Sequence, residues 1–230
     1  MIPENKEKTE GYGMKEDRIT GLGEAPAGEK TDIETAVRNF ERHGFTVRHF
    51  ATGQEAADYL VEEIRDRTVG FGDSHTLSAM GVAKRLEEHN LVTDPGSCPG
   101  SVFELAAENA LTTQIFLTSV NAAAQTGELV NIDSSGNRVA GSLFGHEKVY
   151  YVFSVSKLEP TLERAIWRAR NIAAPRNAKR FGFRTPCAVR GDRCYDCASP
   201  DRICNKIVIY LRKGKVMQEE IVLIDEELGF

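Results

Sequence analysis

Three features that often decide a protein's class are missing from this sequence. No apolar run approaches the roughly 20 residues that a membrane-spanning helix needs, so we expect no membrane span. The opening segment MIPENKEKTEGYGMKEDR is polar and lacks the hydrophobic stretch of a signal peptide, so we expect a cytoplasmic location. The formal net charge is −5, which offers nucleic acid no overall electrostatic attraction.

Cysteine is also scarce, but its distribution is uneven. The chain has five cysteines, and four of them lie in the single run CAVRGDRCYDCASPDRIC. The four are Cys187, Cys194, Cys197 and Cys204. In a reducing compartment such a group indicates a metal site rather than disulfides.

The spacing does not choose between metals. Structural zinc is normally held by two short Cys-x2–4-Cys knuckles, and this run contains one. An iron–sulfur cluster also takes four thiolates and tolerates irregular spacing. We therefore expect zinc or an iron–sulfur cluster, and the alternative of metal-free cysteines, reduced or paired in disulfides, stays open.

The remaining composition is that of an ordinary globular protein. Hydrophobic residues make up 41% and charged residues 27% of the 230 residues, a typical balance. Residues 1–30 contain few apolar side chains and are predicted to form a flexible or loosely docked arm. Residues 31–230, with the cysteine segment included, are predicted to form one domain.

Segments typical of helices and strands alternate through this domain. A helix is predicted from Thr31 or Asp32 to Gly44, and buried strands are predicted at 114–120 and 148–155. The closing runs KIVIYL and EIVLI indicate two more strands, and 128–144 has the pattern of a β-hairpin. The alternation predicts an α/β fold with a mainly parallel sheet and flanking helices.

A glycine-rich turn, GFGDSHT, lies between a predicted strand and a predicted helix. Its glycines let the backbone approach a ligand, and its hydroxyls and N–H groups suit an anion. The candidate ligand-binding residues are Gly72, Asp73, Ser74, His75 and Thr76. The alternative is a tight turn in which Asp73 or Ser74 caps the following helix.

A second polar segment follows the strand predicted at 114–120, where open α/β sheets bind ligands. Its candidate residues are Asn121, Gln125, Thr126 and Gly127. Further along, Arg138 has the geometry to hold a carboxylate or phosphate through two hydrogen bonds, or to pair with Asp133 across the hairpin. Lys157 also follows a predicted strand, and it is either a ligand contact or a solvated loop residue.

Several of these motifs together resemble one family. The segments GFGDSHTLSAMG, TSVNAAAQTGELVNIDSSGNRVAG and NIAAPRNAKRF, the cysteine run and the closing EELGF are similar to LUD-domain proteins, the lactate utilisation proteins of the LutC/YkgG type. The likeness covers residues 30–230 and is strongest to compact members with four cysteines. It implies a fold like that of ribose-5-phosphate isomerase, glucosamine-6-phosphate deaminase and the CoA transferases.

One departure from the family pattern bears on chemistry. Many LUD proteins have Ala-Glu-Thr-Gly where this chain has Ala124-Gln125-Thr126-Gly127, and the stretch is similar to the Glu-x-Gly of CoA transferases. The amide of Gln125 cannot form the acyl anhydride, which disfavours a covalent CoA-transferase mechanism. Glu128 is close by, but its side chain would point to the opposite face of a strand.

The sequence leaves three functions open. The resemblance implies a protein that binds a small anionic metabolite and assists other lactate-utilisation subunits in an iron–sulfur electron-transfer system. The second hypothesis is an autonomous isomerase- or hydrolase-like enzyme acting on a sugar phosphate or related anion, with Glu128, His75 or Asp73 as the base. The third is a metabolite sensor with a structural metal. The oligomeric state, including a homo-oligomer, is undecided.

Overall fold

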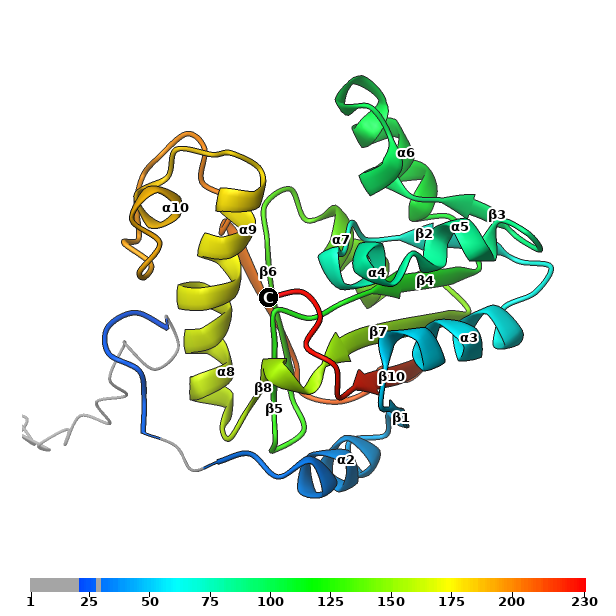
Figure 1. Ribbon diagram of the computed structural model, residues 1–230, viewed down its shortest axis with the longest axis horizontal. Helices are drawn as coiled ribbons and strands as arrows, with labels where there is room; N and C mark the ends of the chain where they lie inside the picture. Colours follow the sequence, from blue (N-terminus) through cyan, green and yellow to red (C-terminus); the bar gives the residue numbers. More distant parts are fainter. Residues whose placement is uncertain (1–20, 28–29) are drawn as a thin grey trace, which may run out of the picture.

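The computed structural model describes residues 21–27 and 30–230. Its centre is a six-stranded parallel sheet with the strand order β1-β10-β7-β4-β2-β3 (Figure 1). The strands are β1 (Thr46–Phe50), β2 (Thr68–Phe71), β3 (Leu91–Thr93), β4 (Ile115–Thr118), β7 (Lys148–Ser154) and β10 (Gln218–Ile224). The prediction of an α/β fold with a mainly parallel sheet is confirmed.

A smaller mixed sheet has the strand order β8-β5-β6-β9. Its strands are β5 (Ala122–Ala124), β6 (Leu129–Asp133), β8 (Leu158–Glu159) and β9 (Lys206–Tyr210). Strand β5 begins four residues after the end of β4, and β8 follows β7 through the 3-10 turn η3 (Val155–Lys157). Two neighbouring strands of the large sheet therefore continue directly into the small one.

Helices cover one face of the large sheet. They are α3 (Gly53–Glu63), α4 (His75–Met80) and α5 (Val82–Leu86). The sequence starts α3 with a capping box, in which Thr52 and Glu55 each bond the other's backbone N–H. Leu60, Leu77 and Val222 are among the buried side chains that join this helical layer to the sheet.

The opposite face of the large sheet is covered by α2 (Ile33–Arg42) and by the small sheet. Asp32 caps α2, whose Phe40 packs edge-on against Phe153 at a centroid distance of 6.3 Å. Leu129 and Tyr210 from the small sheet belong to the same buried cluster. The core is thus two apolar layers, one on each side of the central strands.

A helical column lies against the outer face of the small sheet (Figure 1). It consists of α8 (Leu162–Arg168), the π-turn η4 (Ala169–Ala173) and α9 (Ala174–Arg180), and α10 (Pro186–Arg190) follows. Residues 21–27 dock on α8, since Trp167 Nε1 donates to the Gly23 carbonyl at 3.1 Å and Arg164 donates to the Pro26 carbonyl at 3.1 Å. This part of the predicted arm is docked, while 1–20, 28 and 29 lie outside the described residues.

The predicted hairpin over 128–144 is wrong in its second half. Residues 129–133 do form β6, but 137–143 form the helix α7 (Asn137–Leu143), which begins after Gly136 at a φ of 99°. Strand β6 pairs with β5 and with the distant β9 instead. The remaining elements are α6 (Phe103–Ala110), which projects away from the sheets in Figure 1, and the 3-10 turns η1 (Pro95–Ser97) and η2 (Gly100–Val102). Among the described residues, no helix combines the length and apolarity needed to cross a membrane.

Candidate functional site

Three neighbouring strands of the large sheet end at the same edge, and the segments that follow them meet there. Residues 72–76 follow β2, residues 119–121 follow β4, and η3 with Lys157 follows β7. The carboxyl edge is where open α/β sheets bind ligands. A cavity of about 60 Å³ lies at this edge, and we call it the inner pocket. It is lined by Asp73, Ser74, His75, Thr76, Ser119, Val120, Asn121, Arg138, Lys157, Asn177 and Phe230.

Lys157 carries the main charge of the inner pocket. Its side chain is buried, and Nζ donates to Thr76 Oγ1 and Ser119 Oγ at 3.0 Å each and to the Val120 carbonyl at 3.2 Å. No carboxylate of the described residues accepts a hydrogen bond from Nζ. The fold therefore buries an ammonium group without a counterion, an arrangement that is costly unless a ligand supplies the negative charge.

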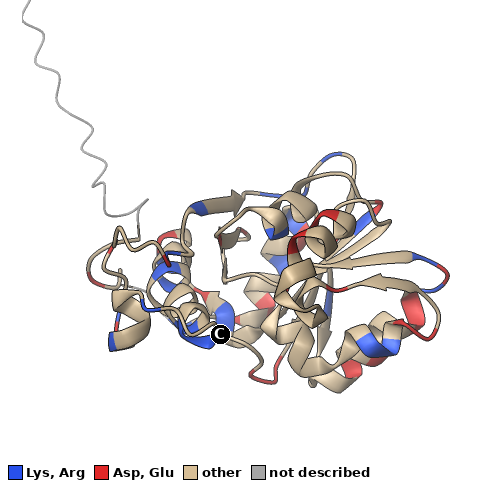
Figure 2. Ribbon diagram, turned by 90° about the horizontal axis from the view of Figure 1, so that it is seen from above, with Lys and Arg blue, Asp and Glu red and all other residues tan. Residues whose placement is uncertain are grey.

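Nearby positive charges add to the cost of burying the Lys157 ammonium group. Burial, together with the nearby guanidinium groups of Arg168 and Arg138, lowers the pKa of Lys157 to about 7. Arg168 is itself buried and donates to the carbonyls of Asn121 and Ser156, at 2.7 and 3.1 Å. Figure 2 shows Lys and Arg segments around the carboxyl end of the chain, which lies beside this pocket. At neutral pH the lysine is therefore poised between its charged and neutral forms.

The glycine-rich turn fixes one wall of the inner pocket. A Cβ on Gly72 would lie 2.8 Å from Arg138 Cγ, so a side chain there would displace the arginine. Asp73 has a φ of 42°, which is uncommon outside glycine and is often found at functional sites. Its carboxylate lies 3.4 Å from Arg180. Ser74 caps α4 by accepting from the Leu77 N–H, as one of the sequence interpretations proposed.

His75 and the last residues of the chain cover the outer side of the inner pocket. The imidazole of His75 stacks on the ring of Phe230, with centroids 4.7 Å apart. Thr76 Oγ1 donates to the Leu228 carbonyl at 3.4 Å. Burial and the positive charges of Arg180 and Lys157 lower the pKa of His75. The histidine is thus neutral at pH 7 and presents an aromatic face rather than a charge.

Arg138 serves the framework of the site. Its Nη1 donates to the Ser119 carbonyl and Asn131 Oδ1, and its Nη2 donates to Asn121 Oδ1 and the Ile132 carbonyl. Its Nε lies 3.6 Å from Asp133, the pairing that the sequence offered as one alternative. With these donors engaged, Arg138 contributes positive charge and ties the segment after β4 to strand β6 at the inner pocket.

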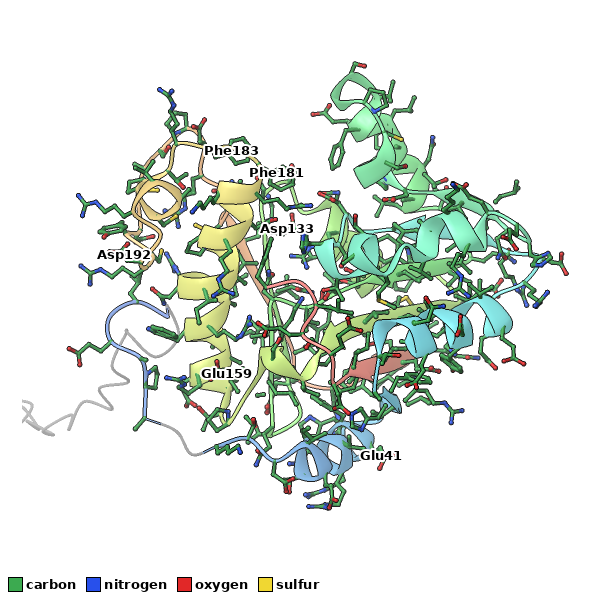
Figure 3. All side chains as sticks on the ribbon, in the orientation of Figure 1. Glu41, Asp133, Glu159, Phe181, Phe183 and Asp192 are labelled. Atoms are coloured by element: carbon green, nitrogen blue, oxygen red, sulfur yellow. The ribbon has the colours of Figure 1, made fainter. Side chains whose placement is uncertain are left out.

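A second, wider cavity opens beside the inner pocket. Its volume is about 300 Å³, and it shares Asp73, Asn121, Arg138 and Asn177 with the inner pocket. Its other lining residues are Gly72, Phe103, Ile132, Asp133, Ser134, Ser135, Asn137, Ala174, Phe181, Phe183 and Ile203. Because they share these lining residues, the two cavities are adjacent. We call them together the cleft, and the wider part the outer chamber. Figure 3 shows Phe181, Phe183 and Asp133 near the end of α9.

The structure divides the predicted ligand-binding residues into two groups. Gly72–Thr76, Asn121 and Arg138 come together at the cleft. Gln125, Thr126, Gly127 and Glu128 do not line it, because they form the tight β5–β6 turn beside α2. There Gln125 Oε1 accepts from the Asp32 N–H at 2.6 Å, and a Cβ on Gly127 would meet the His43 ring.

The candidate bases are separated in the same way. Glu128 bonds to Thr126 within the β5–β6 turn, outside the cleft. Asp73 and His75 lie at the inner pocket. Lys157, which the sequence marked only as following a strand, is the titratable group that lies deepest there. A lone lysine after a strand gives no signal of burial, because its partners come from two segments far away in the sequence, at Thr76 and at Ser119–Val120.

The cysteine run lies between α9 and β9, mostly as irregular chain around α10. Cys194 and Cys204 share a hydrogen bond that lowers the pKa of Cys194 to about 5 and raises that of Cys204. The Asp196 N–H and Arg170 also favour the Cys194 thiolate. Ile203, next to Cys204, lines the outer chamber, so the cysteine segment forms part of the cleft wall.

The cysteine side chains do not together form a metal cage. Cys187 contacts Thr185 Oγ1 at 3.2 Å rather than the Cys194–Cys204 pair. Within residues 21–27 and 30–230, no three His, Cys, Asp or Glu side chains are grouped closely enough to hold a metal ion. The arrangement therefore does not fit a four-thiolate site as it stands, and the metal stays a prediction of the sequence.

The fold and the cleft together define an α/β protein with a cavity at the carboxyl edge of a parallel sheet, the edge at which such folds bind ligands. The chain belongs to the LUD domain family, whose model matches residues 33–224, and this family is related to lactate utilisation. A crystal structure of a DUF162 family protein from Deinococcus radiodurans is similar, with a TM-score of 0.49 and 11% identity over 85% of this chain and 99% of that one. No curated protein matches the sequence.

Proposed function

We propose that this LUD-domain protein binds a small anionic metabolite in the inner pocket. The observation that supports this most directly is the buried Lys157 ammonium, which has hydroxyl and carbonyl partners but no carboxylate among the described residues. A carboxylate or phosphate beside Nζ would supply the missing charge. Asn121 and Arg138 line the same pocket, and Arg138 adds a positive charge to it.

Family membership extends this proposal to a cellular role. The family is related to lactate utilisation, so we propose that the protein assists other subunits of a lactate-utilisation system with iron–sulfur electron transfer. The metabolite would then be a hydroxy or oxo acid of a few carbons. The proposal rests on the family for the role and on Lys157 for the charge of the ligand.

Calorimetry on the purified chain tests the anion site. L-Lactate, pyruvate and inorganic phosphate are the probes, and we expect at least one to bind and to raise the melting temperature by mass action. Lys157→Met should abolish this binding. The matched control is Lys179→Met, because Lys179 is exposed on α9 and lines neither cavity. If no probe binds, or if Lys157→Met binds as well as the wild type, the proposal is wrong.

The near-neutral pKa of Lys157 favours a second candidate, an autonomous enzyme that uses this amine in acid–base catalysis. A lysine with a pKa of about 7 exchanges protons efficiently at neutral pH. Ribose 5-phosphate incubated with the isolated chain, followed by NMR, tests for isomerisation. The expected activity should disappear in Lys157→Met, and a rate equal to that of buffer alone would reject this candidate.

A further inference from the structure

A three-carbon acid bound in the inner pocket would leave the apolar lining of the outer chamber without a contact. Three phenylalanines from two segments line this chamber: Phe103 from the start of α6, and Phe181 and Phe183 from the connection that follows α9. Phe181 is 47% exposed and Phe183 36% exposed. Their rings lie 5.7 Å apart at an interplanar angle of 37°, so they present a broad apolar surface that folding alone does not cover.

The size of the chamber supports a ligand larger than lactate. About 300 Å³ is at the lower end of the range of pockets for drug-sized ligands, roughly 300–1,000 Å³. The inner pocket, at about 60 Å³, has room only for a small head group. A ligand that fills the cleft therefore has a small end and a large end.

The charges that line the two cavities indicate which end of the ligand lies in each. In the outer chamber Asp133 pairs with Arg138, and Asp73 pairs with Arg180, so both carboxylates already have partners. Among the described residues that line the cleft, the buried charge that lacks an opposite charge beside it is that of Lys157, in the inner pocket. Arg180 also lies over the Phe181 ring, with its guanidinium carbon 4.2 Å from the ring centroid.

We propose that the ligand is a small anion joined to a flat ring, with the anion at Lys157 and the ring against Phe181, Phe183 and Phe103. This inference rests on the proposed function, since it names the substrate class of the same site. Aromatic rings pack on one another in offset or edge-on geometry and gain from burial of their apolar faces. The anionic group can be a carboxylate or a phosphate, because Nζ and the pocket hydroxyls bind both.

Two matched ligand pairs test the ring. 3-Phenyllactate is compared with L-lactate, and adenosine 5′-monophosphate with ribose 5-phosphate, by calorimetry on the full chain. In at least one pair we expect the ring-bearing member to bind roughly tenfold tighter or more, since covering a phenyl-sized apolar surface has about that value. The pair that shows the gain identifies the anion as carboxylate or phosphate.

Variants at the ring subsite sharpen the test. Phe181→Ala and Phe183→Ala should each reduce the affinity ratio within the responding pair roughly threefold or more, because each removes part of the apolar surface that the ring covers. Phe144→Ala is the control, since Phe144 is 73% exposed and lines neither part of the cleft. A far-ultraviolet spectrum confirms that each variant is folded.

The two proposals fail in different ways. If L-lactate or ribose 5-phosphate binds through Lys157 but the ring adds nothing in either pair, the inference about the ring is overturned and the anion site stands. If no member of either pair binds, the anion site itself is rejected. If Phe181→Ala changes only the oligomeric state, the rings belong to an interface between copies, which also overturns the inference.

Discussion

Burial makes Lys157 costly to the fold. Its pKa is lowered from 10.5 to about 7, so between these pH values the unfolded chain holds a proton that the folded chain does not. For a base with a lowered pKa, folding stability falls as the pH drops from 10.5 to 7 and then levels off. The proposed function of the pocket and the stability of the protein are therefore opposed at this residue.

Replacing the lysine with an uncharged side chain should remove this pH dependence of the unfolding free energy. We expect Lys157→Met to gain stability relative to wild type as the pH is lowered from about 10 to about 7, by on the order of 3 kcal/mol. Urea unfolding of both proteins at the two pH values measures it. A difference in unfolding free energy that is independent of pH would show that Lys157 titrates near its ordinary value.

The same titration should control ligand binding. An anion binds the protonated amine, so affinity should fall as the pH rises through 7, roughly tenfold or more between about pH 6 and pH 9. His75, Asp73, Arg138 and Arg168 surround the site, and His75 with its lowered pKa adds charge only at the acidic end. Calorimetry at three pH values within this range measures the affinity, with Lys179→Met as the control. A flat profile would contradict a role for the Lys157 charge.

Individual residues of the site were predictable to different degrees. Gly72–Thr76 and Asn121 follow apolar strands, so the sequence predicts that they meet at the carboxyl edge of a parallel sheet, where the structure brings them together. Gln125 and Glu128 are only a few residues further on, but β5 carries the chain away from that edge to the turn beside α2. A strand of three residues, Ala122–Ala124, gives no pattern from which this departure can be predicted.

At the scale of elements, α2 depends on the β5–β6 turn. Gln125 Oε1 accepts from the N–H of Asp32, the residue that caps the helix. We expect Gln125→Ala to lower the free energy of unfolding by about 0.5–1.5 kcal/mol and to leave anion binding intact. Gln54→Ala is the control, because the Gln54 side chain bonds Asp58 on an exposed helix face. Loss of anion binding would place Gln125 in the site instead.

The segment around α10 contains the four clustered cysteines. Four thiols in one run predict a metal, and the irregular chain around them would have to close to hold one. Anaerobic purification should yield zinc near one equivalent or iron with acid-labile sulfide. Cys194→Ser should lose it, while Cys98→Ser, outside the run, should keep it. Absence of zinc and iron would reject the metal.

The helix α7 shows why one element was predicted wrongly. RVAGSLF is largely apolar, and SSGN before it is a typical hairpin turn, so local rules favour a strand that returns beside β6. In the structure β6 already has two neighbours, β5 and β9. The residues after Gly136 instead form a helix that packs so closely on Phe116 that a Cβ on Gly141 would lie 2.6 Å from its ring. Pairing with the distant strand β9 outweighs the local pattern.

At the scale of the whole molecule, the alternation of strands and helices was enough to predict the fold class. It could not give the strand order, which depends on long-range contacts. The last strand, β10, lies between β1 and β7 and pairs with both over their full length. Its side chains Val222 and Ile224 face one buried layer, and Ile221 and Leu223 face the other.

Removal of this strand should therefore prevent folding. A chain that stops at residue 216 would leave β1 detached and β7 with an open edge in the middle of the sheet. We expect it to lack a cooperative unfolding transition in circular dichroism and to aggregate. Lost packing at a single position would not do this, so Val222→Ala in the full chain is the control: it should stay cooperative and lose about 1–3 kcal/mol. A truncated chain that still unfolds cooperatively would contradict the central role of β10.

The position of β10 also sets when the protein can fold during synthesis. A nascent chain has β2, β4 and β7 long before Gln218–Ile224 leaves the ribosome, yet β1 cannot join them until then. The segment after β10 carries Phe230 onto His75, so this part of the wall of the inner pocket forms only after the sheet. Until β10 is made, the nascent chain therefore lacks both a closed central sheet and this wall of the inner pocket, and its unpaired strand edges favour aggregation.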